Sequence, residues 1–147
     1  FADQEVQNID PEPRAVLLDV NGNLCEGLGS NVFIVRGEEI LTPREKFVLP
    51  GVSRQTAIDL AQQEGLTVRE ADLDLYDAYN ANEAFLTSTS LCICPITKIN
   101  GAAIGPDGQV WGPVTRRIAD AYQRFVGHDF VGQYLKHYVD GAPARAF

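Results

Sequence analysis

The chain has 147 residues and a formal charge of −8, from 12 Lys and Arg against 20 Asp and Glu. Its composition, 45% hydrophobic and 22% charged residues, excludes the disordered and fibrous classes of protein. The sequence has no apolar run of the ~18 residues that a membrane span needs, and an acidic surface repels the phosphates of nucleic acid. We therefore expect one globular domain with no membrane and no nucleic-acid partner.

The first third of the chain predicts an extended arm followed by a β-meander. Residues 1–14 are polar and contain two prolines, so we expect an extended entry arm there and a folded domain over 15–147. The Asn21-Gly22 pair favours a tight turn, because both residues tolerate positive φ. Four short apolar stretches have the length of strands: 15–18, 24–26, 31–35 and 40–42.

The remaining sequence alternates helices with strands. Helices are expected over 53–64, 73–79, 114–125 and 129–139, and strands over 67–70, 84–87 and 93–99. Ser53 is expected to cap its helix, since its hydroxyl can accept from a free N–H of the first turn. This alternation is typical of an α/β or α+β domain.

The three cysteines do not predict a disulfide framework or a metal site. Their number is odd and low for a chain that can build its own core. Cys92 and Cys94 offer only two closely spaced ligands, whereas structural zinc sites use four. We expect no bound metal, and the absence of a recognisable secretory signal favours the cytoplasm.

Four short segments carry side chains that are suited to chemistry. Glu26 follows a strand, and Leu49–Arg54 leads into a helix whose first N–H groups are free to bind an anion. The hydroxyl residues at 87–90 can donate to a phosphate or a carboxylate, and Lys98 lies beside a turn. Each segment alone is more often an ordinary surface carboxylate, a capped helix, a polar turn or a solvated lysine.

The order and spacing of these segments resemble the class IV aminotransferases, the fold-type IV enzymes that use pyridoxal 5'-phosphate (PLP). The stretches that carry the resemblance are Glu26–Phe33, Leu41–Pro43, Leu49–Arg54 and Phe85–Ile96, within roughly residues 15–125. The resemblance implies the large C-terminal domain of this fold, a β-meander or pseudo-barrel flanked by helices. It also implies that residues 1–14 are what remains of the region between two domains.

By this resemblance, five residues bind PLP. Glu26 pairs with the pyridine nitrogen, where a carboxylate keeps the ring protonated and therefore able to accept electrons. Leu49 packs on the face of the ring. Val52 and Ser53 bind the phosphate at the start of a helix, and Thr89 adds its hydroxyl.

The resemblance also implies a substrate site. The amides of Ser90 and Leu91 face the substrate carboxylate, while Asn31 fixes the corner and Gly51 lets the backbone approach the anion. Cys92 stands where branched-chain and D-amino-acid enzymes tend to carry an acid, so the substrate subclass stays open.

The resemblance implies a catalytic lysine that this chain does not contain. In the family, the Schiff-base lysine precedes the glutamate, but none of the 25 residues before Glu26 is a lysine, and Lys46, Lys98 and Lys136 come later. We expect the lysine and the small N-terminal domain upstream of Phe1. Cleavage into two chains, truncation, or a relative that has lost catalysis would each explain this.

The expected function is PLP-dependent transamination of an amino acid or amine with a keto-acid acceptor, with this chain inactive alone. A homodimer is expected, with the possibility of a separate N-terminal polypeptide. Two alternatives are an enzyme like aminodeoxychorismate lyase and a non-catalytic binding module that retains the fold.

Overall fold

The structure is a computed structural model that describes residues 2–8, 14–105 and 110–139. Its main sheet has seven strands: β1 (Val16–Leu18), β2 (Leu24–Gly27), β3 (Ser30–Arg36), β4 (Glu39–Pro43), β5 (Thr67–Ala71), β6 (Glu83–Ser88) and β7 (Cys92–Ile96). A two-stranded sheet contains β8 (Lys98–Ile99) and β9 (Ala102–Ala103). The helices are α1 (Ala2–Gln7), the 3-10 turn η1 (Glu45–Phe47), α2 (Val52–Gln63), α3 (Leu75–Tyr79), α4 (Pro113–Val126) and α5 (Phe130–Val139).

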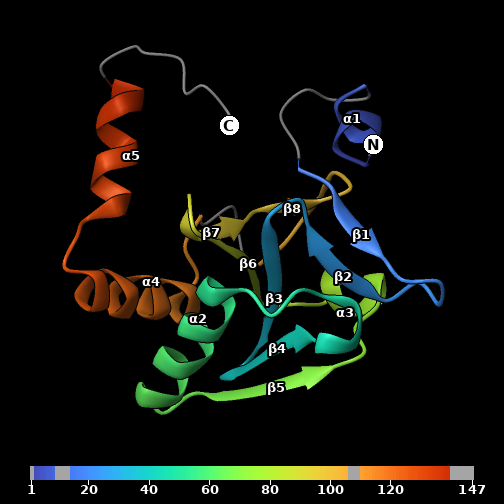
Figure 1. The fold of residues 1–147 in the computed structure, drawn as a ribbon, viewed down its shortest axis with the longest axis horizontal. Coiled ribbons are helices and arrows are strands. Elements are labelled where there is room, and N and C mark those ends of the chain that lie inside the picture. The colour runs from blue at the N-terminus through green and yellow to red at the C-terminus, as the bar shows by residue number, and fades with distance from the viewer. Residues whose placement is uncertain (1, 9–13, 106–109, 140–147) are drawn as a thin grey trace.

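Strand β3 organises the main sheet. Strand β6 pairs with it over residues 31–35, whereas β2 pairs with its beginning and β4 with its end. Strands β4 and β5 run parallel and are joined by α2, while the other pairs are antiparallel. The described strands do not close into a barrel. The expected mixed helix and sheet architecture is thus confirmed, with an open sheet (Figure 1).

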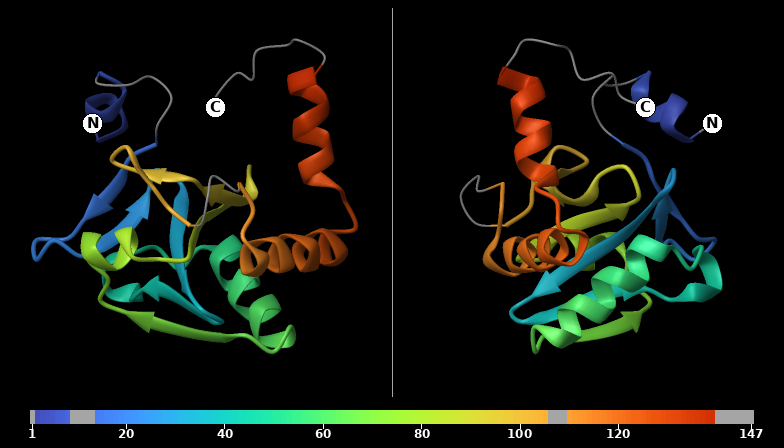
Figure 2. Two further views of the ribbon diagram at one scale, coloured as in Figure 1. Left: turned by 180° about the vertical axis from the view of Figure 1, so that it is seen from behind. Right: turned by 60° about the vertical axis from the view of Figure 1, so that its left-hand side comes forward.

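Each face of the sheet contributes to a separate hydrophobic cluster, because successive strand residues point to opposite sides. Phe33 and Val35 join the cluster that contains residues of α2 and α4, and the ring of Phe33 stacks on that of Phe85 at 4.8 Å. Val32 and Ile34 join the other cluster, with residues around α3. Helices α2 and α4 lie side by side against the sheet, and α5 rises from the end of α4 (Figures 1 and 2).

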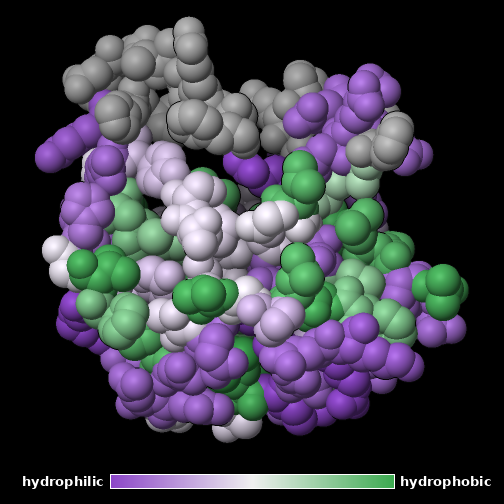
Figure 3. Space-filling view, viewed as in Figure 1, coloured by the Kyte–Doolittle hydropathy of each residue, from purple (hydrophilic) through white to green (hydrophobic). Residues whose placement is uncertain are grey.

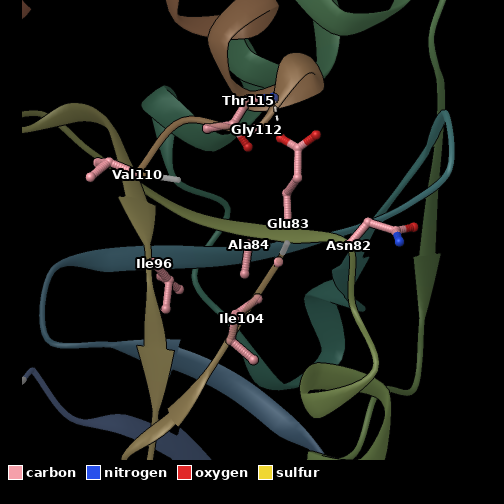
Figure 4. A pocket seen from close by; sticks show the side chains of 9 residues that line it. Asn82, Glu83, Ala84, Ile96, Ile104, Val110, Gly112 and Thr115 are labelled. Carbon is pink, nitrogen blue, oxygen red and sulfur yellow. Dashed lines mark hydrogen bonds between the residues drawn. The ribbon is translucent and has the colours of Figure 1, made fainter. Parts of the chain in front are cut away.

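Helix α4 begins against a buried carboxylate of β6. Glu83 is 7% exposed, and its two oxygens accept from the amides of Val114 at 3.0 Å and Thr115 at 2.7 Å (Figure 4). A Cβ atom at Gly112 would lie 2.0 Å from the Cδ atom of Glu83, so glycine leaves room for this carboxylate. The adjoining cavity of ≈ 10 Å³ has room for about one water molecule. It belongs to the helix start rather than to a ligand site.

The N-terminal arm differs from the sequence-based expectation. Residues Ala2–Gln7 form a helix, not an extended arm, with Asp3 and Glu5 in its first turn. Acidic side chains are favourable there because they face the positive end of the helix dipole. The Asp3 carboxylate also accepts from the Ala15 amide at 2.9 Å. Residues 1 and 9–13 of the expected arm, and 140–147 of the expected domain, lie outside the described residues.

The other elements follow the sequence analysis with shifted ends. The turn at Asn21-Gly22 forms, with Gly22 at φ +86°. The strand expected at 93–99 is divided, because β8 pairs with β9 across a turn in which Asn100 and Gly101 both have positive φ. No helix in the described ranges combines the length and the apolar composition of a membrane span.

Replacing Glu83 with alanine tests the start of α4. The variant leaves two buried amides without acceptors, so we expect the free energy of unfolding in urea to fall by about 2–4 kcal/mol. Glu38→Ala removes an exposed carboxylate and should change it by less than about 0.5 kcal/mol. Equal losses in the two variants would contradict the role assigned to Glu83.

Candidate functional site

Three polar residues form a row across neighbouring strands at one end of the main sheet. Glu26 of β2 lies opposite Asn31 of β3, and Asn31 lies opposite Thr87 of β6. Residues in register on antiparallel strands share a face, so this row continues the face that carries Phe33 and Phe85. The two-residue turn between Gly27 and Ser30 sets the register of the first pair.

The Glu26 carboxylate is fixed through one of its two oxygens. Its Oε2 atom accepts from the Leu49 amide at 3.0 Å and from Nδ2 of Asn31 at 3.3 Å. The same Nδ2 group donates to the Leu49 carbonyl at 3.1 Å. Within the described ranges Oε1 has no hydrogen-bond donor. The carboxylate is therefore oriented by the protein while one oxygen stays open to a ligand.

Helix α2 begins beside this row, and the expected role of Ser53 as its cap is wrong. The N-cap residue is Gly51, at φ −64° and ψ 138°, and Ser53 is the second helical residue. An ideal Cβ atom at Gly51 would lie 2.3 Å from Oδ1 of Asn31, so a glycine leaves room for the Asn31 side chain at this position. The first intrahelical bond runs from Gln55 to Gly51, leaving the preceding amides, including those of Val52 and Ser53, without intrahelical acceptors.

Arg54 attaches the first turn of α2 to the sheet. Its side chain is 1% exposed and donates to Glu70 at 2.7 Å, to Glu45 at 3.1 Å and to the Pro43 carbonyl at 3.0 Å. A buried guanidinium is stable only when paired in this way. The position of the free helix amides is therefore fixed by contacts with the ends of β4 and β5.

The hydroxyl-rich corner between β6 and β7 lies at the same end of the sheet as the row. Thr89 and Ser90 are exposed and Leu91 is half-buried. The Leu91 amide, expected to face a substrate, donates to Oγ of Ser88 at 3.0 Å. The Ser90 amide has no partner within the part of the chain that the structure describes. Ser90 thus offers a free backbone donor at this corner.

Thr87 was included among the hydroxyl residues at 87–90 in the sequence analysis without a role of its own, and Tyr134 was missed. Thr87 is 1% exposed, and its hydroxyl has no partner among the described residues. Tyr134 of α5 donates its hydroxyl to the Ser90 carbonyl at 2.6 Å. The alternation of β6 could have placed Thr87 on the face of Phe85. No local signal connects Tyr134 to a residue 44 positions away.

The surface around the row is apolar. Leu49 is 71% exposed and Val52 is 78% exposed, and Leu28 in the turn after Glu26 is similarly exposed. Figure 3 shows apolar side chains on this face of the molecule, above a hydrophilic lower band. Lys98 lies on β8 in the separate small sheet, and so is not a member of the row.

The cysteines do not add a reactive or metal-binding group. Burial raises the pKa of the Cys92 thiol, which follows the corner directly. A raised pKa leaves the thiol protonated at neutral pH and therefore a weak nucleophile. No group of three or more ligating side chains occurs within the described residues.

Comparison with known proteins identifies the family. The family model "Amino-transferase class IV" matches residues 2–99. The chain belongs to the class IV aminotransferase family. It is 39% identical over 110 residues to the branched-chain-amino-acid aminotransferase of Escherichia coli, covering 74% of this chain and 35% of that protein. It is 36% identical over 110 residues to branched-chain-amino-acid aminotransferase-like protein 2 of Arabidopsis thaliana, covering 75% and 19%.

Solved structures share the fold. The Escherichia coli branched-chain amino acid aminotransferase superposes with a TM-score of 0.77 at 35% identity, covering 86% of this chain and 41% of that one. An aminotransferase from Brucella abortus, bound to the cofactor PLP, gives a TM-score of 0.76 at 31% identity, covering 86% and 43%. The chain spans less than half the length of each of these relatives.

Replacing Gly51 with alanine tests the contact between α2 and the row. The added methyl group displaces the Asn31 amide from Glu26 and Leu49, so we expect the free energy of unfolding to fall by about 1–3 kcal/mol. Asn31→Ala removes the clash, so Gly51→Ala should cost clearly less in that background. Strictly additive losses in the double-mutant cycle would show that the two residues do not interact.

Proposed function

We propose that the protein transfers the amino group of an amino acid or amine to a keto acid with PLP as its cofactor, and that this chain supplies the cofactor-binding part. The observation that carries the proposal is the Glu26 carboxylate, held at Oε2 and open at Oε1. Its place beside the free amides of α2 supports the same function, as does the family to which the chain belongs.

The donor set fits the chemistry of PLP. A phosphate ester suits the amides of Val52 and Ser53, because the start of a helix favours an anion. A protonated pyridine nitrogen suits the open oxygen of Glu26. Thr87, buried in the same row without a partner, adds a hydroxyl two strands away from Glu26, a separation of about 10 Å between backbones. PLP carries its phosphate on a methylene arm away from the ring nitrogen, so Glu26 and the phosphate donors would contact different parts of the cofactor.

The residues of this chain would bind and orient rather than react. When bound, PLP supplies an electron sink for the electron pair left after the substrate loses its Cα proton. Glu26 would hold the proton on the ring nitrogen, and the bonds from Leu49 and Asn31 keep its carboxylate in place. The exposed side chain of Leu49 would cover one face of the ring and exclude water. The Thr89 hydroxyl would donate to the phosphate.

At the corner, the Ser90 amide is the proposed donor to the substrate carboxylate. The Leu91 amide is proposed as a second donor only once Ser88 releases it, since Ser88 accepts from it in this structure. Substrate binding is thus assigned first to the Ser90 amide.

The proton shuttle is assigned to a lysine upstream of Phe1. Lys46 stands over the Phe47 ring at 5.0 Å, and Lys98 belongs to the small sheet. Lys136 is exposed on α5, so none of the three lysines belongs to the row. We propose that the small N-terminal domain likewise belongs to the part of the protein that this chain does not span.

We propose that the protein forms a homodimer in the cytoplasm. Exposed apolar side chains around the row, at Leu28, Leu49 and Val52, are of the kind that subunit or domain contacts cover. The free state of all three cysteines fits a reducing compartment. A separate N-terminal polypeptide would occupy the same apolar surface.

Titration of the full protein with PLP tests this function. We expect a visible absorption band. Borohydride reduction should abolish the band and attach the cofactor permanently to a lysine. Glu26→Ala should weaken PLP binding roughly 10- to 100-fold, since it removes a charged partner, and Thr89→Ala about two- to tenfold, since it removes the hydroxyl proposed for the phosphate. Glu38→Ala, which removes an exposed carboxylate, should leave PLP binding unchanged.

Three results would contradict parts of the proposal. No PLP binding by the full protein would favour a non-catalytic module. Release of pyruvate from a substrate like aminodeoxychorismate, without a keto-acid acceptor, would favour the lyase. Equal PLP affinities for Glu26→Ala and Glu38→Ala would remove Glu26 from the site.

A further inference from the structure

The peptide group between Ser90 and Leu91 is held at both of its polar ends. Its carbonyl oxygen accepts from the Tyr134 hydroxyl at 2.6 Å, and its N–H group donates to Oγ of Ser88 at 3.0 Å. In a trans peptide these two groups point in opposite directions. The two bonds together therefore fix the plane of the peptide and the shape of the corner.

The two holding groups come from different parts of the molecule. Ser88 is 7% exposed and ends β6, so its hydroxyl belongs to the rigid sheet. Tyr134 belongs to α5, which follows α4 directly in the chain. One helical turn before Tyr134, Phe130 is buried and meets the Tyr122 ring of α4 edge-on at 5.9 Å. Residues four apart share a helix face, so the anchored face of α5 is the face that carries Tyr134.

We infer that Tyr134 is a positioning residue for the substrate carboxylate, an inference that rests on the proposed function. The Ser90 N–H group belongs to the preceding peptide and is joined to the held peptide through the Ser90 Cα atom. By holding the Ser90 carbonyl, the Tyr134 hydroxyl restricts rotation at Ser90 and so limits the directions in which the Ser90 amide can point. Without this bond, the peptide can rotate about the single bonds on either side of it. The Ser90 amide then faces the substrate carboxylate in only a fraction of the protein molecules. The apparent affinity for substrate is the intrinsic affinity multiplied by that fraction.

The first test is kinetic and uses the full protein loaded with PLP. Tyr134→Phe removes only the hydroxyl, and we expect it to raise KM for both the amino donor and the keto acid about two- to tenfold. PLP affinity should change less than KM, because Thr89 is the one proposed cofactor-binding residue at this corner and Glu26, Leu49, Val52 and Ser53 lie on β2 or around the start of α2. Tyr76→Phe is the matched control, since Tyr76 is 73% exposed on α3 and should alter neither quantity.

The second test needs no activity. Hydrogen exchange of the Leu91 amide in the PLP-free protein should quicken about two- to tenfold in Tyr134→Phe and stay unchanged in Tyr76→Phe. Ser88→Ala removes the acceptor itself, and should quicken exchange at least as much.

Three outcomes would overturn the inference. An unchanged Leu91 exchange rate in Tyr134→Phe would show that the hydroxyl does not hold the peptide. An unchanged KM, or a parallel loss of PLP affinity, would show that it does not position substrate. Failure of the full protein to bind PLP is a different result: it ends the proposed function, while the exchange rate still decides whether Tyr134 holds the corner.

Discussion

The rest of the site depends on the contacts of the Asn31 carboxamide group. Its Nδ2 group bonds both to Glu26 and to the Leu49 carbonyl, and its Oδ1 atom lies where any Cβ on Gly51 would be. One side chain thus joins the end of β2 to the segment that leads into α2. The orientation of the acid and the position of the helix start are consequently set together rather than independently.

Strand register and helix position then divide the site into two ends. Pairing across β2, β3 and β6 separates Glu26 from Thr87 by two interstrand spacings. The first turn of α2 is fixed to the sheet by the bonds of the buried Arg54 side chain to Pro43 and Glu70, which hold its free amides in place. An acid at one end and hydroxyl and amide donors at the other suit a rigid ligand with a cationic ring nitrogen and an anionic tail.

Local patterns predicted much of the fold, and the motif spacing predicted the candidate site. Alternating apolar residues located the strands, and backbone preference located the turn at Asn21-Gly22, although only Gly22 has a positive φ and the Asp19 carboxylate also accepts from the Asn21 and Asn23 amides. The start of α2 was misplaced, because the hydroxyl of Ser53 favoured that residue as the cap. The helix begins after Gly51, and the close contact of Gly51 with Asn31 joins residues that are distant in the sequence. Likewise, the bond between Tyr134 and Ser90 joins residues far apart in the chain, so it depends on how α5 packs on α4.

The groups proposed to bind the cofactor and the corner at Ser90 differ in how they are held. The cofactor end is built from charged and amide groups anchored in buried contacts, such as those of Arg54. The corner at Ser90 depends on two neutral hydroxyl bonds, one of them from the partly exposed Tyr134. Neutral bonds of this kind contribute less than charged ones. Under the proposed function, a cofactor that stays through both halves of a transfer would need the firmer contacts, whereas a corner that accepts and releases two different substrates in turn would benefit from the weaker ones.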